Sequence, residues 1–64
     1  MNNHLMKYVD YINNTGLTPL PVAAFDEDWE PVGQMVREQM VEADLIQCRA
    51  DGIYLRPDLV REPK

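Results

Sequence analysis

The run Asp26-Glu27-Asp28-Trp29-Glu30 concentrates carboxylates, which are side chains that bind hard cations or transfer protons. As the start of a calcium-binding loop it would supply the first three ligands. Such a loop then needs a glycine and ends on a bidentate glutamate, but this chain has Pro31 and Arg37 at those two positions. The run therefore favours a solvated turn whose acids precede a helix, where the helix dipole stabilises negative charge.

Cys48 and His4 are the only cysteine and the only histidine of the chain. A thiol nucleophile needs a histidine base close by, but His4 lies near a terminus and the strand pattern directs Cys48 inward. Two such residues do not complete the ligand set of a zinc site. Acid–base catalysis by carboxylates needs a desolvated cleft, for which a chain of 64 residues has little volume. We therefore expect no enzyme activity, no metal and no other cofactor.

A basic and aromatic group occurs near the end of the chain, and it consists of Gln47, Arg49, Tyr54 and Arg56. Alternation along a strand places all four on one face, with Tyr54 opposite Arg49. Two interpretations remain open. The face is either a solvated one on which an arginine stacks on a tyrosine, or an interface, since both residue types are enriched at binding hot spots.

The overall charge restricts the partners of the chain. Eleven acids against six bases give a net charge of −5, which repels polyanions such as nucleic acid and anionic membrane surfaces. No apolar run approaches the roughly 20 residues of a membrane span, and no signal peptide is recognisable. A single cysteine suits a reducing compartment, so we expect a cytoplasmic protein. Small domains often need a disulfide, a metal or a second subunit to be stable. Self-association as a homodimer is the one of these that the sequence leaves open.

Apolar periodicity predicts two long helices with a short one between them. The first covers Asn3–Thr15 and ends at Gly16 in a left-handed conformation; its inner stripe is Leu5, Tyr8, Val9 and Ile12. A short helix begins at Pro21 and runs through Phe25. The third helix covers Pro31–Asp44. Its predicted apolar face consists of Val32, Met35, Val36, Met40 and Ala43, and its far side carries Gln34, Arg37, Glu38 and Val41.

A β-hairpin is predicted next, from Leu45–Ala50 and Ile53–Arg56 around an Asp51-Gly52 turn. This register pairs Ala50 with Ile53, Cys48 with Leu55 and Ile46 with Pro57. It directs one face toward the helices, made of Ile46, Cys48, Ile53 and Leu55. We expect one domain over residues 1–57, followed by an irregular tail over 58–64.

The order of these elements, carried by Leu5–Thr15, Pro21–Phe25, Pro31–Asp44 and the Leu45–Arg56 hairpin, resembles a minimal winged helix-turn-helix domain of the α+β class. The resemblance implies a third helix that enters the DNA major groove through Gln34, Arg37, Glu38 and Val41. It also implies a wing that contacts the DNA backbone through Arg49 and Arg56.

The charge of the third helix departs from that pattern. The helix carries one base, Arg37, against three acids, Glu38, Glu42 and Asp44. Duplex binding rests on several neutralised phosphates, which six dispersed bases do not supply from one face. We therefore expect a non-enzymatic regulatory module that binds a protein. The alternative is a DNA-binding transcriptional regulator that needs dimerisation or a partner. The predicted partner surface is Gln34, Arg37, Glu38, Val41, Arg49, Tyr54 and Arg56.

Overall fold

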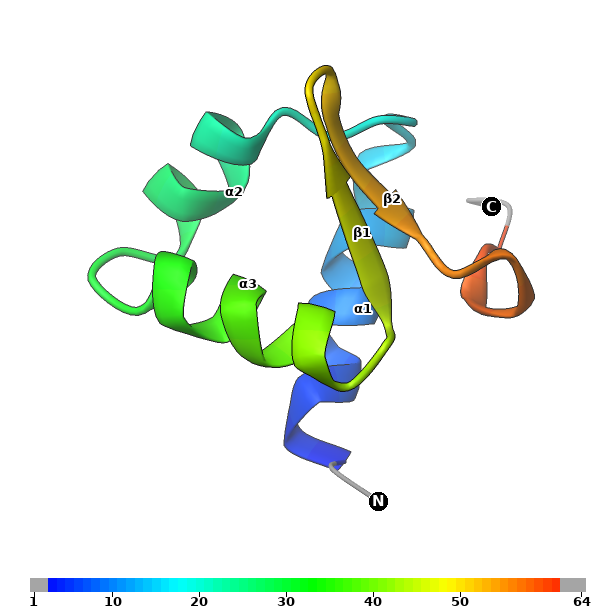
Figure 1. Cartoon of the computed structure of the whole chain (residues 1–64), viewed down its shortest axis with the longest axis horizontal. Coiled ribbons are helices and arrows are strands. Elements are labelled where there is room, and N and C mark those ends of the chain that lie inside the picture. The colour runs from blue at the N-terminus through cyan, green and yellow to red at the C-terminus, as the bar shows by residue number, and fades with distance from the viewer. Residues whose placement is uncertain (1–2, 62–64) are drawn as a thin grey trace.

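The computed structural model describes residues 3–61, which form three helices followed by a two-stranded antiparallel hairpin and a short 3-10 helix. The elements are α1 (Asn3–Thr15), α2 (Val22–Asp28), α3 (Gly33–Glu42), β1 (Ile46–Arg49), β2 (Gly52–Leu55) and the 3-10 helix η1 (Pro57–Leu59). Figure 1 shows α2 and α3 on one side of the hairpin and α1 behind it. The predicted α+β class is therefore confirmed, and the layout is compatible with a winged-helix-like domain.

Helix α1 has the predicted bounds and the predicted buried stripe. It ends at Gly16, whose φ of 69° lies in the left-handed region that glycine adopts without steric cost. The Thr15 hydroxyl completes this end. It donates a hydrogen bond to the Ile12 carbonyl at 2.6 Å and accepts one from the Leu17 N–H at 3.2 Å. The side chain thus satisfies backbone groups that a helix end leaves without partners.

Helix α2 is longer than predicted and begins one residue later. Pro21 precedes it as the N-cap, and the helix continues past Phe25 to Asp28, so it includes the first acids of the acidic run. Its contact with α3 depends on Gly33. A Cβ at that position would lie 2.8 Å from both the Cα and the carbonyl oxygen of Asp26. Glycine therefore allows the two helix backbones to touch.

The close approach at Gly33 sets which side of α3 is buried. The buried residues of α3 are Gly33, Val36 and Met40. The predicted apolar face was wrong at three positions, because Val32, Met35 and Ala43 are exposed. The observed buried face is centred on Gly33. It is therefore rotated about the helix axis relative to the predicted face, which was centred on the apolar residues beside this glycine. The predicted bounds were also too wide, since Pro31 and Asp44 lie outside the helix.

The hairpin register differs from the prediction. Ile46 pairs with Leu55, Cys48 with Ile53 and Arg49 with Gly52, so the turn is Ala50-Asp51 rather than Asp51-Gly52. The reason lies in a third chain segment. Leu20 bridges to Ile53 by two backbone hydrogen bonds of 3.1 and 2.7 Å. A Cβ on Gly52 would lie 2.7 Å from the Leu20 carbonyl oxygen. Gly52 is therefore needed inside the strand, beside Leu20.

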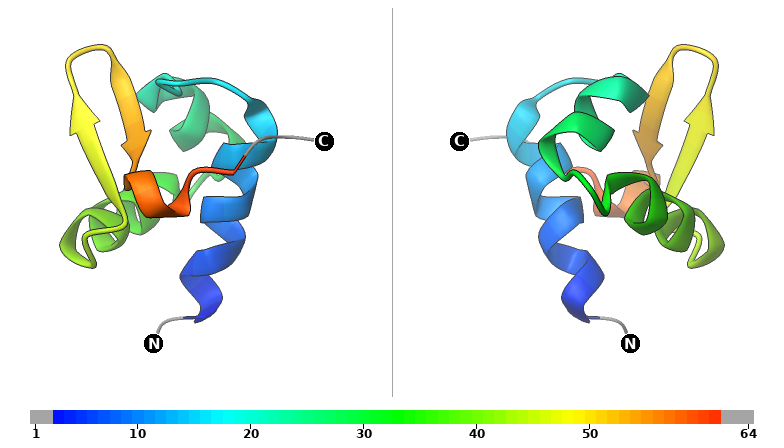
Figure 2. Two further views of the ribbon diagram at one scale, coloured as in Figure 1. Left: turned by 90° about the vertical axis from the view of Figure 1, so that its right-hand side faces the viewer. Right: turned by 90° about the vertical axis from the view of Figure 1, so that its left-hand side faces the viewer.

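The core lies between α1, α2, α3 and the inner face of the hairpin (Figure 2). Ile46 and Ile53 of the hairpin are buried and Leu55 is half-buried, as their predicted side requires. Cys48 is exposed, which corrects the prediction that it faces inward. Only the first residue of β1 reaches the core, because the rest of this edge strand extends past it.

The segment after the hairpin is hydrogen-bonded to α1 through Asn13. Asn13 donates from Nδ2 to the Leu59 carbonyl at 3.0 Å, and its Oδ1 accepts the Arg61 N–H at 2.8 Å. The predicted irregular tail thus begins with the ordered helix η1, and residues 62–64 of it lie outside the described part. Within residues 3–61, no helix has the length and apolar character needed to cross a membrane.

Candidate functional site

Arg37, predicted on the outer side of α3, is directed toward α2. Its Nε and Nη2 donate to the two carboxylate oxygens of Asp26, each at 3.0 Å, and the pair is partly buried. These hydrogen bonds raise the pKa of Arg37 above its ordinary value, with a smaller contribution from the Cys48 thiol. Arg37 therefore joins α3 to α2 and lies close to β1. It is not free to meet a partner as a separate cation.

The outer face of the hairpin carries an arginine–tyrosine stack, but the prediction that Tyr54 lies opposite Arg49 was wrong, because Tyr54 pairs with Gln47 and Arg49 with Gly52. The Arg49 guanidinium lies 5.5 Å from the centroid of the Tyr54 ring, and its Nη2 donates to Gln47 Oε1 at 3.0 Å. The Tyr54 hydroxyl donates to Asp51 Oδ2 at 2.6 Å, which raises the pKa of Tyr54. Arg49 and Tyr54 thus each interact with side chains of the hairpin itself.

Arg56 follows β2 and pairs with the first turn of η1. Its Nε and Nη2 donate to the two oxygens of Asp58 at 2.6 and 2.9 Å. The contact raises the pKa of Arg56 and lowers that of Asp58, although both side chains are well exposed. All three arginines of the predicted surface therefore interact with acceptors of their own chain.

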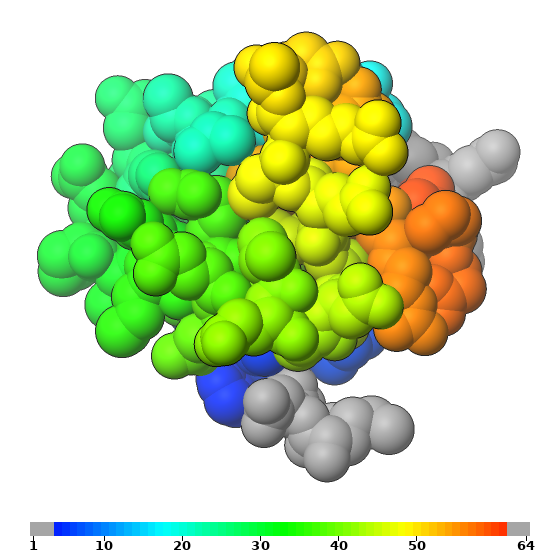
Figure 3. Space-filling view, viewed as in Figure 1, coloured from blue at the N-terminus to red at the C-terminus, as the bar shows by residue number. Residues whose placement is uncertain are grey.

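The remaining predicted residues, Gln34, Glu38 and Val41, are exposed on α3. Gln34 donates to Glu38 at 3.2 Å. Figure 3 shows α3, in green, beside the hairpin, in yellow. The two outer faces nevertheless point in different directions. Figure 1 presents the hairpin nearly edge-on with β1 in front, whereas the left view of Figure 2 presents it face-on. The predicted surface thus bends around the β1 edge.

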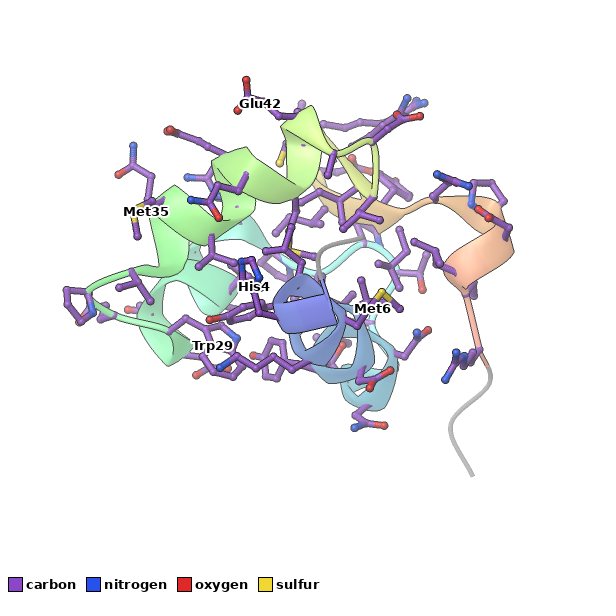
Figure 4. All side chains as sticks on the ribbon, turned by 90° about the horizontal axis from the view of Figure 1, so that it is seen from below. His4, Met6, Trp29, Met35 and Glu42 are labelled. Atoms are coloured by element: carbon purple, nitrogen blue, oxygen red, sulfur yellow. The ribbon has the colours of Figure 1, made fainter. Side chains whose placement is uncertain are left out.

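The sequence reasoning missed an apolar part of the α3 surface. Val32 is 37% exposed and Met35 is 54% exposed. Figure 4, seen from below, shows Met35 on α3 directed away from α1. The signal for these exposed residues was Gly33, since a glycine that rotates the buried face also turns its apolar neighbours outward.

Trp29 closes the core beneath this apolar part. Its ring lies 4.7 Å from that of Tyr8 and 5.3 Å from that of Tyr11, in edge-to-face geometry. Its Nε1 is buried without a hydrogen-bond partner. Tyr11 donates a hydrogen bond to Asp28, and this bond is the main cause that raises the pKa of Tyr11 to about 12.

The charges around α3 are mostly uncompensated. The ion pairs among residues 3–61 involve Asp10, Asp26 and Asp58. The acids outside these pairs include four at the end of α2 and along α3: Glu27, Glu30, Glu38 and Glu42. The exposed side of α3 therefore combines unpaired negative charge with exposed apolar side chains.

The hollows of the molecule are shallow. One of about 220 Å³ lies between the end of α1, β2 and the segment after η1, and its apolar walls include Ile12, Leu17, Leu55 and Val60. Within the described residues, no group of three or more metal-ligating side chains comes together.

No protein-family model matches this chain, and no curated protein or solved structure is significantly similar to it.

Proposed function

We propose that this chain is a small, non-enzymatic binding module of regulatory type that acts by contact with a protein, either a different chain or a second copy. The observation that carries the proposal is the surface of α3. Of the five large apolar residues that the described part exposes, three lie on α3 or at its N-cap, namely Val32, Met35 and Val41. Val32 and Met35 lie one turn apart, and exposed apolar groups with a polar rim are typical of protein interaction sites.

The second candidate is a winged-helix DNA-binding regulator that needs dimerisation or a partner, and the order of elements favours it. The charges do not support it. The exposed acids Glu38 and Glu42 lie on the helix that would enter the groove, and Arg37, Arg49 and Arg56 already interact within the chain. Phosphate contacts would have to replace these interactions before contributing affinity.

A cytoplasmic location is part of the same proposal. Cys48 is a single exposed thiol, and such a thiol remains reduced in the cytoplasm, where disulfides are rare.

Two variants of the intact chain test the protein-binding function. Val41→Glu adds a charge to the exposed side of α3, and Tyr54→Ala removes the ring from the outer face of the hairpin. We expect the double variant to lose self-association in sedimentation experiments, or to lose the capture of a host protein, with little change in helical circular dichroism. A double variant that folds and binds as the parent does would place the working surface elsewhere.

A titration with mixed-sequence duplex DNA separates the two candidates. At roughly physiological salt, we expect no binding tighter than about 1 μM, because few phosphates are neutralised. Tighter binding that weakens as salt is added would support the DNA-binding alternative.

A further inference from the structure

We propose that the outward side of α3 binds a cationic amphipathic segment of the partner protein, a proposal that rests on the protein-binding function above. The segment would present lysine or arginine side chains together with apolar ones. The α3 surface that receives it is defined by Val32, Met35, Glu38 and Glu42, and is called here the α3 patch.

The apolar part of the α3 patch is exposed for a structural reason. Helix α3 contacts α2 at Gly33, and this contact fixes which side of α3 is buried. Val32 and Met35 lie outside that side and are therefore exposed. Met35 remains 54% exposed, more than any other large apolar residue of the described part. A flexible thioether side chain adapts to partners of different shape, which is why methionine is common on binding surfaces of broad specificity.

The charged part of the α3 patch defines the chemistry of the segment. Met35, Glu38 and Glu42 follow one another at helical spacing along the side opposite to the buried residues. Figure 4 shows Met35 near one end of α3 and Glu42 near the other, both directed away from α1. No ion pair among the described residues involves Glu38 or Glu42. A segment with spaced cations would compensate both carboxylates and cover the methionine.

A second copy of this chain fits the α3 patch less well than a cationic segment does. In a two-fold dimer centred on the α3 patch, Glu38 and Glu42 of the two copies would come close together. Like charges brought together in this way oppose association. The chain's four arginines are engaged elsewhere, by Asp26, by Asp58, by Asp10 and by the Tyr54 stack. A foreign cationic segment therefore has the complementary charge that a second copy lacks.

The test uses the full chain and a labelled synthetic peptide of about 15 residues with lysine and leucine at helical spacing. Two comparison peptides carry glutamine or glutamate in place of lysine. One variant, Glu38→Gln with Glu42→Gln, removes two charges of the α3 patch. Its matched control, Glu27→Gln with Asp10→Asn, removes two exposed charges outside the α3 patch and outside the hairpin. Met35→Gln is matched by Val60→Gln, since the two residues are 54% and 53% exposed.

We expect binding of the lysine peptide to fall at least about fivefold in the α3-patch charge variant and about tenfold in Met35→Gln. Both controls should stay within about twofold of the parent. Affinity should also fall as salt rises from about 50 to about 500 mM, because exposed charges are screened. Equal binding of the three peptides, or equal losses in variants and controls, would overturn the proposal.

The outcome is distinguishable from failure of the protein-binding function. A protein that is captured by the parent, lost in Val41→Glu and retained in the α3-patch charge variant would leave that function standing. It would overturn the assignment of a cationic segment.

Discussion

The outer face of the hairpin and the outward side of α3 are both exposed and polar, but their charges are used differently. On the hairpin side, Arg49 stacks on Tyr54 and Arg56 pairs with Asp58. On α3, Glu38 and Glu42 form no ion pair with described residues, and Met35 beside them is exposed. From the sequence alone, the arginines and the tyrosine of the hairpin are the stronger candidates for binding. In the structure, however, it is the acids of α3 that have no ion-pair partner among the described residues.

This difference shows how a candidate residue can be judged. A side chain whose hydrogen bonds and charge are already satisfied within its own chain must give them up before it binds a partner. Glu38 and Glu42 form no ion pair with described residues, so a cationic partner has to replace only their hydration and the bond from Gln34 to Glu38. The predictions below test whether the hairpin region serves stability while the α3 surface serves binding.

The largest expected effect is that of Ile53→Ala. Ile53 is buried in the core and its backbone pairs with Leu20, so truncation should lower the free energy of unfolding by about 2–4 kcal/mol. The exposed counterpart, Met35→Ala, should change it by less than about 0.5 kcal/mol. Thermal unfolding followed by circular dichroism measures both. A midpoint unchanged by Ile53→Ala would contradict the packing of the hairpin on the helices.

The next effect concerns Gly52→Ala. The Cβ would lie 2.7 Å from the Leu20 carbonyl oxygen, and the residue has a φ of 147° that side chains rarely adopt. We expect a loss of about 1–3 kcal/mol in the free energy of unfolding. Urea titration measures it. A stable variant with unchanged exchange protection at the Leu20 and Ile53 amides would show that this glycine is not required.

A smaller effect separates two arginines. Arg37→Gln removes two hydrogen bonds from the partly buried Asp26 and should lower the free energy of unfolding by about 1–2 kcal/mol. Arg56→Gln removes a fully exposed pair with Asp58, and the thermal midpoint should not change measurably. Equal losses in the two variants would contradict the distinction between an internal link and a surface contact.

The smallest effect is confined to high pH. The pKa of Tyr11 is raised from 10.0 to about 12, so the folded chain holds the phenolic proton more tightly than the unfolded chain. The resulting stabilisation is complete below pH 10 and is lost as the pH rises toward 12. Absorbance titration should show a tyrosine ionising near pH 12 that is missing in Tyr11→Phe. Tyrosines that all ionise near their ordinary pKa would contradict the bond to Asp28.

The elements that could be predicted are those set by local pattern. Helix α1 follows from its apolar spacing and from Gly16, and its bounds were correct. The buried face of α3 was not predictable from periodicity, because it depends on contact between Gly33 and Asp26 of another helix. The hairpin turn was misplaced for a similar reason. Asp51-Gly52 is a strong local turn signal, but Leu20 needs the glycine in the strand.

The candidate site was predictable to a similar extent. The exposure of Glu38 and Val41 and the stack of Arg49 on Tyr54 follow from helix and strand periodicity, and these predictions are confirmed. The engagement of Arg37 by Asp26 is a tertiary contact, and so is the exposure of Met35. Neither the contact nor the exposure can be predicted from the apolar spacing of α3 alone. The partner role of all these residues stays a prediction.

The most direct test of the account compares two pairs of variants in one capture experiment with the full, immobilised chain. One pair, Met35→Gln and Val41→Glu, changes the exposed side of α3, and the other, Arg49→Gln and Arg56→Gln, changes the hairpin side. Proteins retained from a host extract are quantified by mass spectrometry, and circular dichroism confirms that every variant is folded. The account predicts that the first pair loses the protein retained by the parent while the second pair keeps it. Loss in the arginine variants with retention in the α3 variants would contradict it.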